Sequence, residues 1–267
     1  MATDKTAWAL VLGASSGFGK AAALELAALG MNIVGVHLDR KSTLPEVDRL
    51  VAEIHARGRE ALFFNVNAAD AEKRREVVDA VEARFQAHGD AATIRVFLHS
   101  LAFGTLRRFV TDTRADAVSK AQVDMTLDVM ANSLVYWVQE LVARGLMGHG
   151  GRIFAMTSAG GARVWSTYGA VSAAKAALES HVRQLALELA PMGITANAIM
   201  AGVTDTPALR KIPGSDDMIA LAQRKNPSRR LTTPQDVAEA IGLLSGPKSH
   251  WMTGNVICVD GGEFIVD

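Results

Sequence analysis

Short apolar runs alternate along the chain with longer segments in which apolar residues recur every three or four positions. The runs predict buried strands, and the longer segments predict helices with one apolar face. Strands are expected at residues 7–12, 33–38, 61–65, 94–98, 152–156, 194–200 and 255–259, and helices at residues 20–29, 46–57, 70–88, 121–144, 173–190 and 234–245. This alternation, without internal repeats or breaks in composition, predicts an α/β fold with a single doubly wound parallel seven-stranded sheet and helices on both faces. We expect one domain over residues 1–267.

The longest segment without a clear period is residues 201–230, which contains Pro207, Pro213 and Pro227. Segments of this length inside a compact α/β domain are usually lids or binding loops. We therefore expect a substrate loop inserted at about residues 201–230.

Composition narrows the class of protein. An apolar content of 49% and a charged content of 21% indicate a soluble globular chain, and a net charge of +0 gives no support for binding nucleic acid or a membrane surface. The single cysteine, Cys258, excludes a disulfide within the chain and is expected to be a small core residue. With no apolar stretch of membrane-spanning length and no signal-peptide pattern, we expect a cytoplasmic protein.

A glycine-rich turn follows the first predicted strand and opens a helix. Its spacing is Gly13-x-x-x-Gly17-x-Gly19. Glycines at such a turn let the backbone approach a ligand, and the helix N-terminus offers free N–H groups to a pyrophosphate. The alternative is a turn in which glycine serves close packing only. The functional interpretation is a Rossmann-type dinucleotide site contacted by Gly13, Ser15, Ser16, Gly17, Phe18 and Gly19.

The ends of the second and third strands carry candidate contacts to the adenosine half of a dinucleotide. Asp39 suits the ribose hydroxyls, whereas its neighbour Arg40 suits a 2′-phosphate. The basic cluster Arg40-Lys41 favours NADPH, with NADH as the alternative. These charges are also explained by a solvent-exposed loop that binds no cofactor. Asn65 closes the third strand, either against the adenine edge or as a turn-forming residue.

The fourth strand runs into His99-Ser100-Leu101-Ala102-Phe103. No carboxylate or cysteine stands near His99 at triad or metal spacing, so backbone contact with a cofactor is the favoured interpretation of this segment. No pair among the seven histidines has helical metal-ligand spacing with a carboxylate, and we expect no metal site.

Ser158, Tyr168 and Lys175 surround the start of the long helix. Ser158 follows a predicted buried strand, and open parallel sheets place their ligand crevice at the carboxyl ends of strands. Tyr168 and Lys175 are separated by about two helical turns, which directs both side chains to nearly the same face. The functional interpretation is a proton-donating phenol beside a cation. The alternative without a functional role is a tyrosine at a helix start and a lysine on the surface.

Taken together, these motifs resemble the short-chain dehydrogenase/reductase family over nearly the whole chain. The residues on which this resemblance rests are Gly13-x-x-x-Gly17-x-Gly19, Asn65-Val66, Ser158, Lys175 within Ala173-Ala174-Lys175-Ala176-Ala177-Leu178, and Val259-Asp260-Gly261-Gly262. The family's usual catalytic tyrosine position falls on Val171, and its usual helix asparagine falls on Met130. Two of the four ordinary polar catalytic residues are therefore apolar here.

The spacing Tyr168-x-x-x-x-x-x-Lys175 resembles the enoyl-acyl-carrier-protein reductase branch of the family, as do the segment after the fourth strand and Gly202-x-x-Asp205-Thr206-x-Ala208-Leu209. A second tyrosine that follows the serine in one type of these enzymes is replaced by Ala159. The resemblance implies catalytic roles for Tyr168, Lys175 and Ser158, and a homotetramer. Further cofactor contacts are implied at Arg40, Asn65, Val66, Ser100, Leu101, Ala102, Lys175, Gly202, Val203 and Thr206.

The implied reaction is reduction of the C2–C3 double bond of an enoyl thioester, carried by CoA or an acyl carrier protein, in fatty acid or related acyl synthesis. Tyr168 would bind the thioester oxygen, and Lys175 would hold the ribose and favour the phenolate. Two alternatives stay open: a ketone or ketoacyl reductase with a displaced tyrosine, and a non-catalytic dinucleotide-binding regulator. Candidates for an acyl channel are Phe103, Met156 and Met200, and candidates for carrier docking are Arg107-Arg108, Arg224-Lys225 and Arg229-Arg230, each also explained by core packing or solubility.

Overall fold

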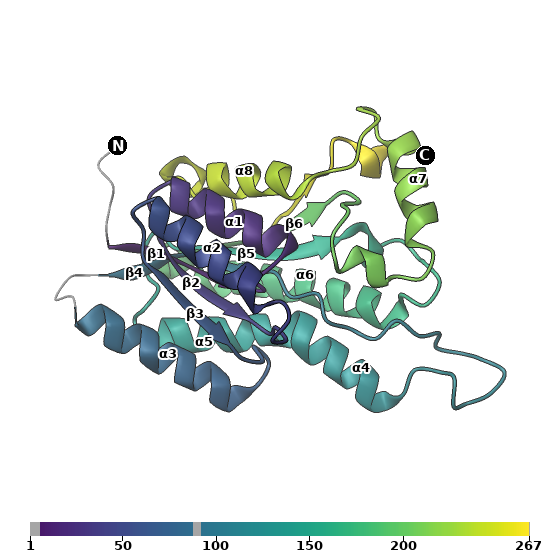
Figure 1. Cartoon of the computed structure of the whole chain (residues 1–267), viewed down its shortest axis with the longest axis horizontal. Helices are drawn as coiled ribbons and strands as arrows, with labels where there is room; N and C mark the ends of the chain where they lie inside the picture. Colours follow the sequence, from purple (N-terminus) through teal and green to yellow (C-terminus); the bar gives the residue numbers. More distant parts are fainter. Residues whose placement is uncertain (1–5, 88–91, 267) are drawn as a thin grey trace.

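Seven parallel strands form one sheet in the order β3-β2-β1-β4-β5-β6-β7 (Figure 1). The computed structural model describes residues 6–87 and 92–266. The strands are β1 (Ala7–Leu12), β2 (Asn32–His37), β3 (Ala61–Asn65), β4 (Thr93–His99), β5 (Arg152–Ser158), β6 (Thr195–Ala201) and β7 (Val256–Val259). The predicted fold class, a doubly wound parallel seven-stranded sheet, is confirmed.

Helices cover both faces of this sheet (Figure 1). One face packs against α1 (Gly17–Ala28), α2 (Leu44–Ala56) and α8 (Pro234–Leu244). The other packs against α3 (Ala71–Gln86), α5 (Ser133–Ala143) and α6 (Gly169–Leu189), with α4 (Lys120–Leu127) beside α6. Two separate apolar cores result, one on each side of the sheet.

Local sequence explains where most elements begin and end. Every residue of β1 is buried, as its uninterrupted apolar run predicts for a central parallel strand. In α6 the buried residues include Val171, Ala174 and Leu178, a spacing of three and four that forms one apolar face. The helix ends before Pro191, as predicted, because proline cannot continue the backbone hydrogen bonds.

Two predicted elements differ from the structure. The helix expected over residues 121–144 is divided into α4 and α5 by a π-helical turn, Asp128–Asn132. The segment 201–230, expected to be irregular, contains α7 (Ser215–Lys225). The less exposed face of α7 carries Met218, Ile219 and Ala222, of which only Ala222 is buried. Its acidic first turn and basic last turn give further support. The other bounds agree within a few residues, and His88, the expected end of α3, lies outside the described residues.

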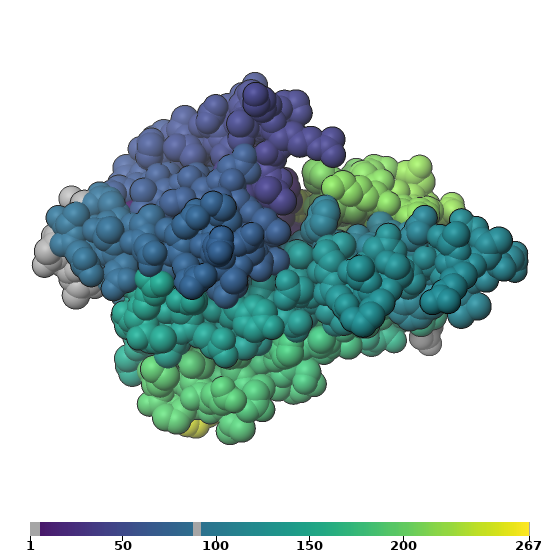
Figure 2. All heavy atoms as spheres, turned by 90° about the horizontal axis from the view of Figure 1, so that it is seen from below, coloured from purple at the N-terminus to yellow at the C-terminus, as the bar shows by residue number. Residues whose placement is uncertain are grey.

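The strand order reverses between β1 and β4, which places the expected ligand crevice at their carboxyl ends. The N–H of Ser100 donates to the carbonyl of Leu12 at 2.9 Å, so the segments leaving these two strands stay together. The segment 100–119 then reaches out toward α4 at the same end of the molecule as α7 (Figure 1). Seen from below, the surface is hollowed between the purple N-terminal part and the light-green residues of α7 (Figure 2).

Within residues 6–87 and 92–266, no helix combines the length and the apolar character needed to cross a bilayer.

Candidate active site

Three consecutive residues at the end of β5 each hold a different residue of the α6 region. The Lys175 ammonium donates to the Met156 carbonyl at 2.6 Å, and the Thr157 hydroxyl donates to the Glu179 carboxylate at 2.6 Å. The Ser158 and Tyr168 hydroxyls lie 3.4 Å apart. The structure therefore brings the predicted catalytic residues Ser158, Tyr168 and Lys175 together at one strand end.

The Tyr168 phenol is mostly enclosed. Burial raises the pKa of this phenol above its ordinary value, and the hydrogen bond with Ser158 opposes the rise only in part. The expectation from sequence is that Lys175 favours the phenolate form of Tyr168. In the structure the Lys175 ammonium donates to the Met156 carbonyl, and Lys175 is not among the groups that shift the pKa of Tyr168. Burial therefore favours the neutral form of the Tyr168 phenol.

Lys175 is completely buried beneath the site. Burial lowers the pKa of its ammonium to about 8, against the opposing attraction of Glu179. An amine with such a pKa exchanges protons readily near neutral pH. Lys175 is thus both a fixed donor and a titratable group at the floor of the site.

The two apolar residues at the family's usual catalytic positions meet each other. Met130, in the π-helical turn, and Val171, in α6, belong to one buried cluster on which Tyr168 packs. A Cβ at Gly104 would lie 2.9 Å from the Met130 sulfur and 2.9 Å from a Val171 methyl. The position that Val171 occupies is therefore filled by packed apolar groups, and Tyr168 supplies the phenol from the preceding turn of the chain.

The glycine-rich turn combines packing glycines with an open helix end. A Cβ at Gly13 would lie 2.3 Å from the Ser100 carbonyl oxygen, and one at Gly19 would lie 2.0 Å from the Gly13 oxygen, so both glycines are required by close backbone contacts. Gly17 has φ of 52°, and a Cβ there would lie 3.6 Å from a Thr206 methyl group. No side chain caps the N-terminus of α1 at Ser16. Free N–H groups at a helix N-terminus, next to glycines without side chains, suit a pyrophosphate. The turn therefore fits a dinucleotide.

Asp39 lies beside this turn in a set of hydrogen bonds. Its carboxylate accepts from Thr43 at 2.8 Å and lies 3.0 Å from the His37 ring nitrogen. Burial raises the pKa of Asp39, but hydrogen bonds from Ser15, Thr43 and His37 outweigh it and leave the pKa lowered. The ionised carboxylate therefore points to the turn that would hold the adenosine ribose, whereas Arg40 is exposed.

Asn65 ties the ends of β3 and β2 together. Its side-chain oxygen accepts from the Asp39 N–H at 2.8 Å, and its amide donates to the Asp39 carbonyl at 3.0 Å. These contacts match the turn-forming interpretation. The neighbouring Val66 is partly buried against the core.

His99 is fully buried at the end of β4. Its Nε2 lies 2.8 Å from the Ser133 hydroxyl, and its Nδ1 is buried without a hydrogen-bond partner. Burial and then the charge of Lys175 lower the pKa of His99 to about 3, so the ring is neutral at ordinary pH. The next residues, Ser100, Leu101 and Ala102, line the segment against which Gly13 packs.

The segment after β6 holds the remaining predicted cofactor contacts. Thr206 is buried and faces Gly17, which joins this segment to the glycine-rich turn. Gly202 packs against Thr232, and the Val203 N–H donates to the Glu263 carboxylate at 3.1 Å. Of the acyl-channel candidates, Met156 and Met200 are buried, whereas Phe103 is 59% exposed.

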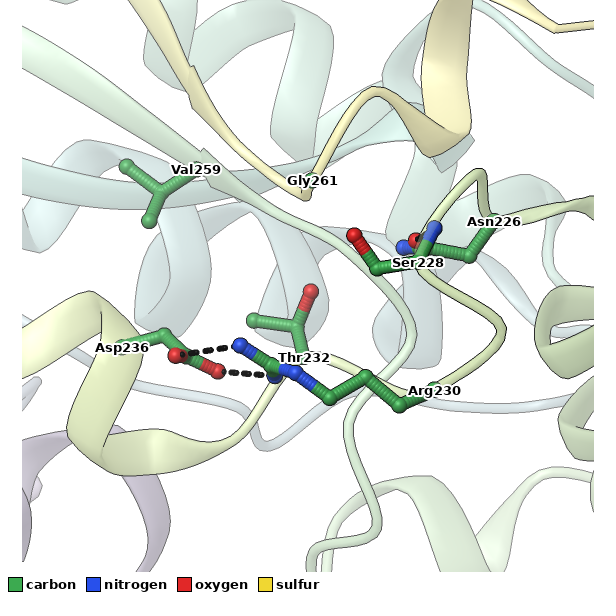
Figure 3. A pocket seen from close by; sticks show the side chains of 7 residues that line it. All are labelled: Asn226, Ser228, Arg230, Thr232, Asp236, Val259 and Gly261. Atoms are coloured by element: carbon green, nitrogen blue, oxygen red, sulfur yellow. Dashed lines mark hydrogen bonds and ion pairs between the residues drawn. The ribbon is translucent and has the colours of Figure 1, made fainter.

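A pocket lies at the end of β7, between residues 226–232 and the start of α8 (Figure 3). Arg230 and Asp236 form a two-point ion pair across it, at 2.6 and 2.9 Å. Because this pair neutralises itself, the pocket gives no reason to expect a charged ligand. Its lining residues are Asn226, Ser228, Arg230, Thr232, Asp236, Val259 and Gly261.

No cluster of three or more histidine, cysteine, aspartate or glutamate residues suited to a metal ion occurs among the residues that the structure describes.

Sequence reasoning missed Glu179, Gly160 and Thr167. Glu179 lies four residues after Lys175 on α6, and this helical spacing was the available signal. A Cβ at Gly160 would lie 2.4 Å from the Tyr168 ring, and Thr167 has a left-handed backbone; neither is visible in local sequence.

Comparisons with known proteins point to one family. The family model described as Enoyl-(Acyl carrier protein) reductase matches residues 13–263. The 1-cyclohexenylcarbonyl-CoA reductase of Streptomyces collinus is 30% identical, over 98% of this chain and 89% of the relative. An NADH-type enoyl-[acyl-carrier-protein] reductase of a Nostoc species is 30% identical, over 91% and 90%. The 3-oxoacyl-[acyl-carrier-protein] reductase of Aggregatibacter actinomycetemcomitans is 31% identical, over 95% and 97%.

The fold comparison agrees. The crystal structure of FabI from Candidatus Liberibacter asiaticus superimposes with a TM-score of 0.84 at 25% identity, covering 97% of this chain and 95% of that one. The chain belongs to the short-chain dehydrogenase/reductase family of oxidoreductases, in the group that the enoyl-(acyl carrier protein) reductase model describes.

Proposed function

We propose that the protein reduces the C2–C3 double bond of enoyl thioesters with a nicotinamide dinucleotide, in fatty acid or related acyl synthesis. The observation that carries this proposal is the Tyr168 phenol 3.4 Å from the Ser158 hydroxyl, while Val171 fills the family's usual tyrosine position with packed apolar atoms. The relatives named as enoyl-CoA and enoyl-acyl-carrier-protein reductases support the same reaction class.

The dinucleotide, when bound, supplies the hydride for C3 of the substrate. Addition of hydride at C3 would push the electron pair of the C2–C3 double bond onto the thioester oxygen, where a neutral phenol in a low-dielectric site would stabilise the charge by donating a hydrogen bond. A proton taken up from solvent at C2 would complete the reduction. The raised pKa of Tyr168 keeps that donor protonated at neutral pH. Ser158 lies where it would orient the phenol. Lys175, whose ammonium donates to the Met156 carbonyl in this structure, would hold the nicotinamide ribose when the dinucleotide is bound.

The uncapped helix α1 and the segment at Gly202, Val203 and Thr206 would hold the rest of the dinucleotide. Sequence favours NADPH through Arg40. The hydrogen-bonded carboxylate of Asp39 beside Ser15 instead supports NADH, because an ionised carboxylate binds ribose hydroxyls and repels a 2′-phosphate. We propose NADH as the preferred cofactor, contrary to the expectation from sequence.

Reduction of a 3-ketoacyl thioester is the second candidate. The relative that is 31% identical and named as a 3-oxoacyl-[acyl-carrier-protein] reductase favours it. In that reaction hydride goes to the carbonyl carbon, and the phenol must protonate the oxygen bonded to that same carbon. The two reactions therefore require different distances between the phenol and the nicotinamide.

A turnover assay separates these candidates. Purified protein is mixed with crotonyl-CoA or acetoacetyl-CoA and with NADH or NADPH, and absorbance at 340 nm is followed. Oxidation with crotonyl-CoA supports the proposal, and oxidation only with acetoacetyl-CoA replaces it with the second candidate. Tight dinucleotide binding without any turnover would indicate a non-catalytic regulator.

The same assay, with the acyl group on an acyl carrier protein, tests the preferred carrier. Arg107 and Arg108 are exposed, whereas Arg230 is paired with Asp236. We therefore place the proposed carrier contact at Arg107-Arg108 rather than at Arg229-Arg230.

A further inference from the structure

The residue before the candidate catalytic tyrosine has a left-handed backbone. Thr167 has φ of 67°, a region that β-branched residues strongly avoid. Its hydroxyl oxygen is buried without a hydrogen-bond partner. Strain of this kind persists only where surrounding contacts enforce it, and it concentrates at functional sites.

Gly160 leaves the space that the Tyr168 ring occupies. A Cβ at this position would lie 2.4 Å from Cε1 of the ring and 3.2 Å from the Ser158 hydroxyl. The φ of Gly160 is not in the left-handed region, so the missing side chain matters here for space and not for backbone freedom. The ring and the glycine are complementary.

The segment between these two residues is anchored at its centre. The Trp165 indole donates to the Pro213 carbonyl at 3.1 Å, and the Tyr168 N–H donates to the Trp165 carbonyl at 3.2 Å. Tyr168 immediately precedes α6, whose first residue is Gly169. The turn at Thr167 thus sets how the chain enters α6 and where the phenol points.

We propose that Thr167 and Gly160 are positioning residues for Tyr168: the left-handed turn at Thr167 directs the ring toward β5, and Gly160 admits it to hydrogen-bond distance of Ser158. The inference rests on the proposed function for its kinetic readout. Tyr168 precedes α6, so the helix itself does not fix the direction of its side chain. Thr167 and Gly160 fix that direction instead.

The first test is Gly160→Ala, with Gly148→Ala as the matched control. A Cβ at Gly148 has nothing within 4 Å, and its φ is also outside the left-handed region. We expect Gly160→Ala to lower kcat by about 10- to 100-fold, because small misplacements of a catalytic group have effects of this size. Dinucleotide Kd should stay within about twofold of wild type, since the atoms nearest to the added Cβ belong to Tyr168 and Ser158 and not to the glycine-rich turn. Equal loss of kcat in both variants, or none in Gly160→Ala, overturns the role of Gly160.

The second test varies Thr167 in three ways. Asparagine tolerates the left-handed region, so Thr167→Asn should keep kcat within about twofold and raise the Tm by about 2–4 °C. Thr167→Pro, which imposes φ near −65°, should lower kcat by about 100-fold. Thr167→Val keeps the shape without the hydroxyl and should keep kcat. Loss of activity in Thr167→Val or Thr167→Asn would assign the effect to the hydroxyl and overturn the backbone role.

A spectroscopic readout keeps this inference separate from the proposed function. The chain has two tyrosines, Tyr136 and Tyr168, so Tyr136→Phe leaves Tyr168 as the sole phenol. Its pKa is followed by absorbance at 295 nm. Because burial and Ser158 both act on that pKa, Gly160→Ala, which displaces the ring from both, should change it measurably, and Gly148→Ala should not. An unchanged pKa overturns the inference even if crotonyl-CoA is reduced; a shifted pKa supports it even if no substrate is turned over.

Discussion

Lys175 is a titrating group at the floor of the site, and the Glu179 carboxylate lies near it. Burial lowers the pKa of Lys175 to about 8, and the nearby Glu179 carboxylate raises it. The other titratable group near Lys175 is His99, whose pKa of about 3 keeps it neutral. The Lys175 ammonium is therefore present below about pH 8 and is lost as pH rises through that value.

We expect kcat/KM for the dinucleotide to fall above about pH 8, as the Lys175 ammonium deprotonates. In Glu179→Gln the carboxylate that favours the ammonium is absent, so this alkaline limb should move to lower pH. Glu188→Gln, on the same helix and bonded to Gln184, is the control and should leave the profile unchanged. A limb that stays in place in Glu179→Gln would exclude electrostatic control of Lys175 by Glu179.

Asp39 is the residue that we expect to decide cofactor preference. Its carboxylate is ionised and held beside Ser15, so replacing it removes repulsion of a 2′-phosphate. Asp39→Ala should increase the ratio of kcat/KM for NADPH to that for NADH by about tenfold or more. Kinetics with both cofactors measures this ratio. A wild-type enzyme that already prefers NADPH, together with a loss of that preference in Arg40→Ala, would restore the role predicted for Arg40.

At the scale of elements, the π-helical turn and the start of α6 meet through apolar contacts. Met130 and Val171 pack together over Gly104, so neither position is open to a polar group without other changes. This packing ties the side chains at the two positions to each other, so a change at one affects the space at the other.

Met130→Asn should therefore destabilise the protein instead of restoring ordinary ketone reduction. An amide buried here without hydrogen-bond partners costs about 1–3 kcal/mol of unfolding free energy. Urea denaturation measures the change, with Met192→Asn, at a methionine that is 42% exposed, as the control. A fully stable Met130→Asn with new acetoacetyl-CoA reductase activity would show that the cluster leaves the site adaptable.

For the molecule as a whole, the β7 edge of the sheet carries exposed apolar side chains. Trp251, 89% exposed, and Met252 precede β7, and Val256 is exposed on the strand itself. Leu243, 81% exposed, lies near the end of the neighbouring helix α8. An edge strand beside large exposed apolar groups is typical of a surface that another chain covers. We propose that it contributes to the homotetramer expected from the resemblance.

Light scattering coupled to size exclusion should give a tetramer for the wild-type protein. Leu243→Glu combined with Trp251→Glu should shift it to smaller species, because burying two charges without partners opposes association. Val164→Glu alters a side chain that is 95% exposed and away from β7, and it should leave the assembly unchanged. A wild-type monomer would remove the proposed role of this edge.

Much of the fold followed from local pattern alone. Uninterrupted apolar runs such as β1 and the periodic face of α6 are set by which side chains avoid water, and this requires no knowledge of distant residues. The position of Ser158 at a strand end was predictable for the same reason. The helix α7 was not predicted, because the apolar residues of its less exposed face, Met218, Ile219 and Ala222, span little more than one helical turn and lie between Pro213 and Pro227.

The sequence by itself determined the sheet, the glycine-rich turn and the spacing of Tyr168 and Lys175, because these depend on local periodicity and helix geometry. Only the tertiary structure decided how those groups are tuned. The Met156 carbonyl holds Lys175, burial keeps the Tyr168 phenol neutral, and Gly160 makes room for its ring. Desolvation and contact across the chain set these properties, and neither exists until the strands and helices pack together.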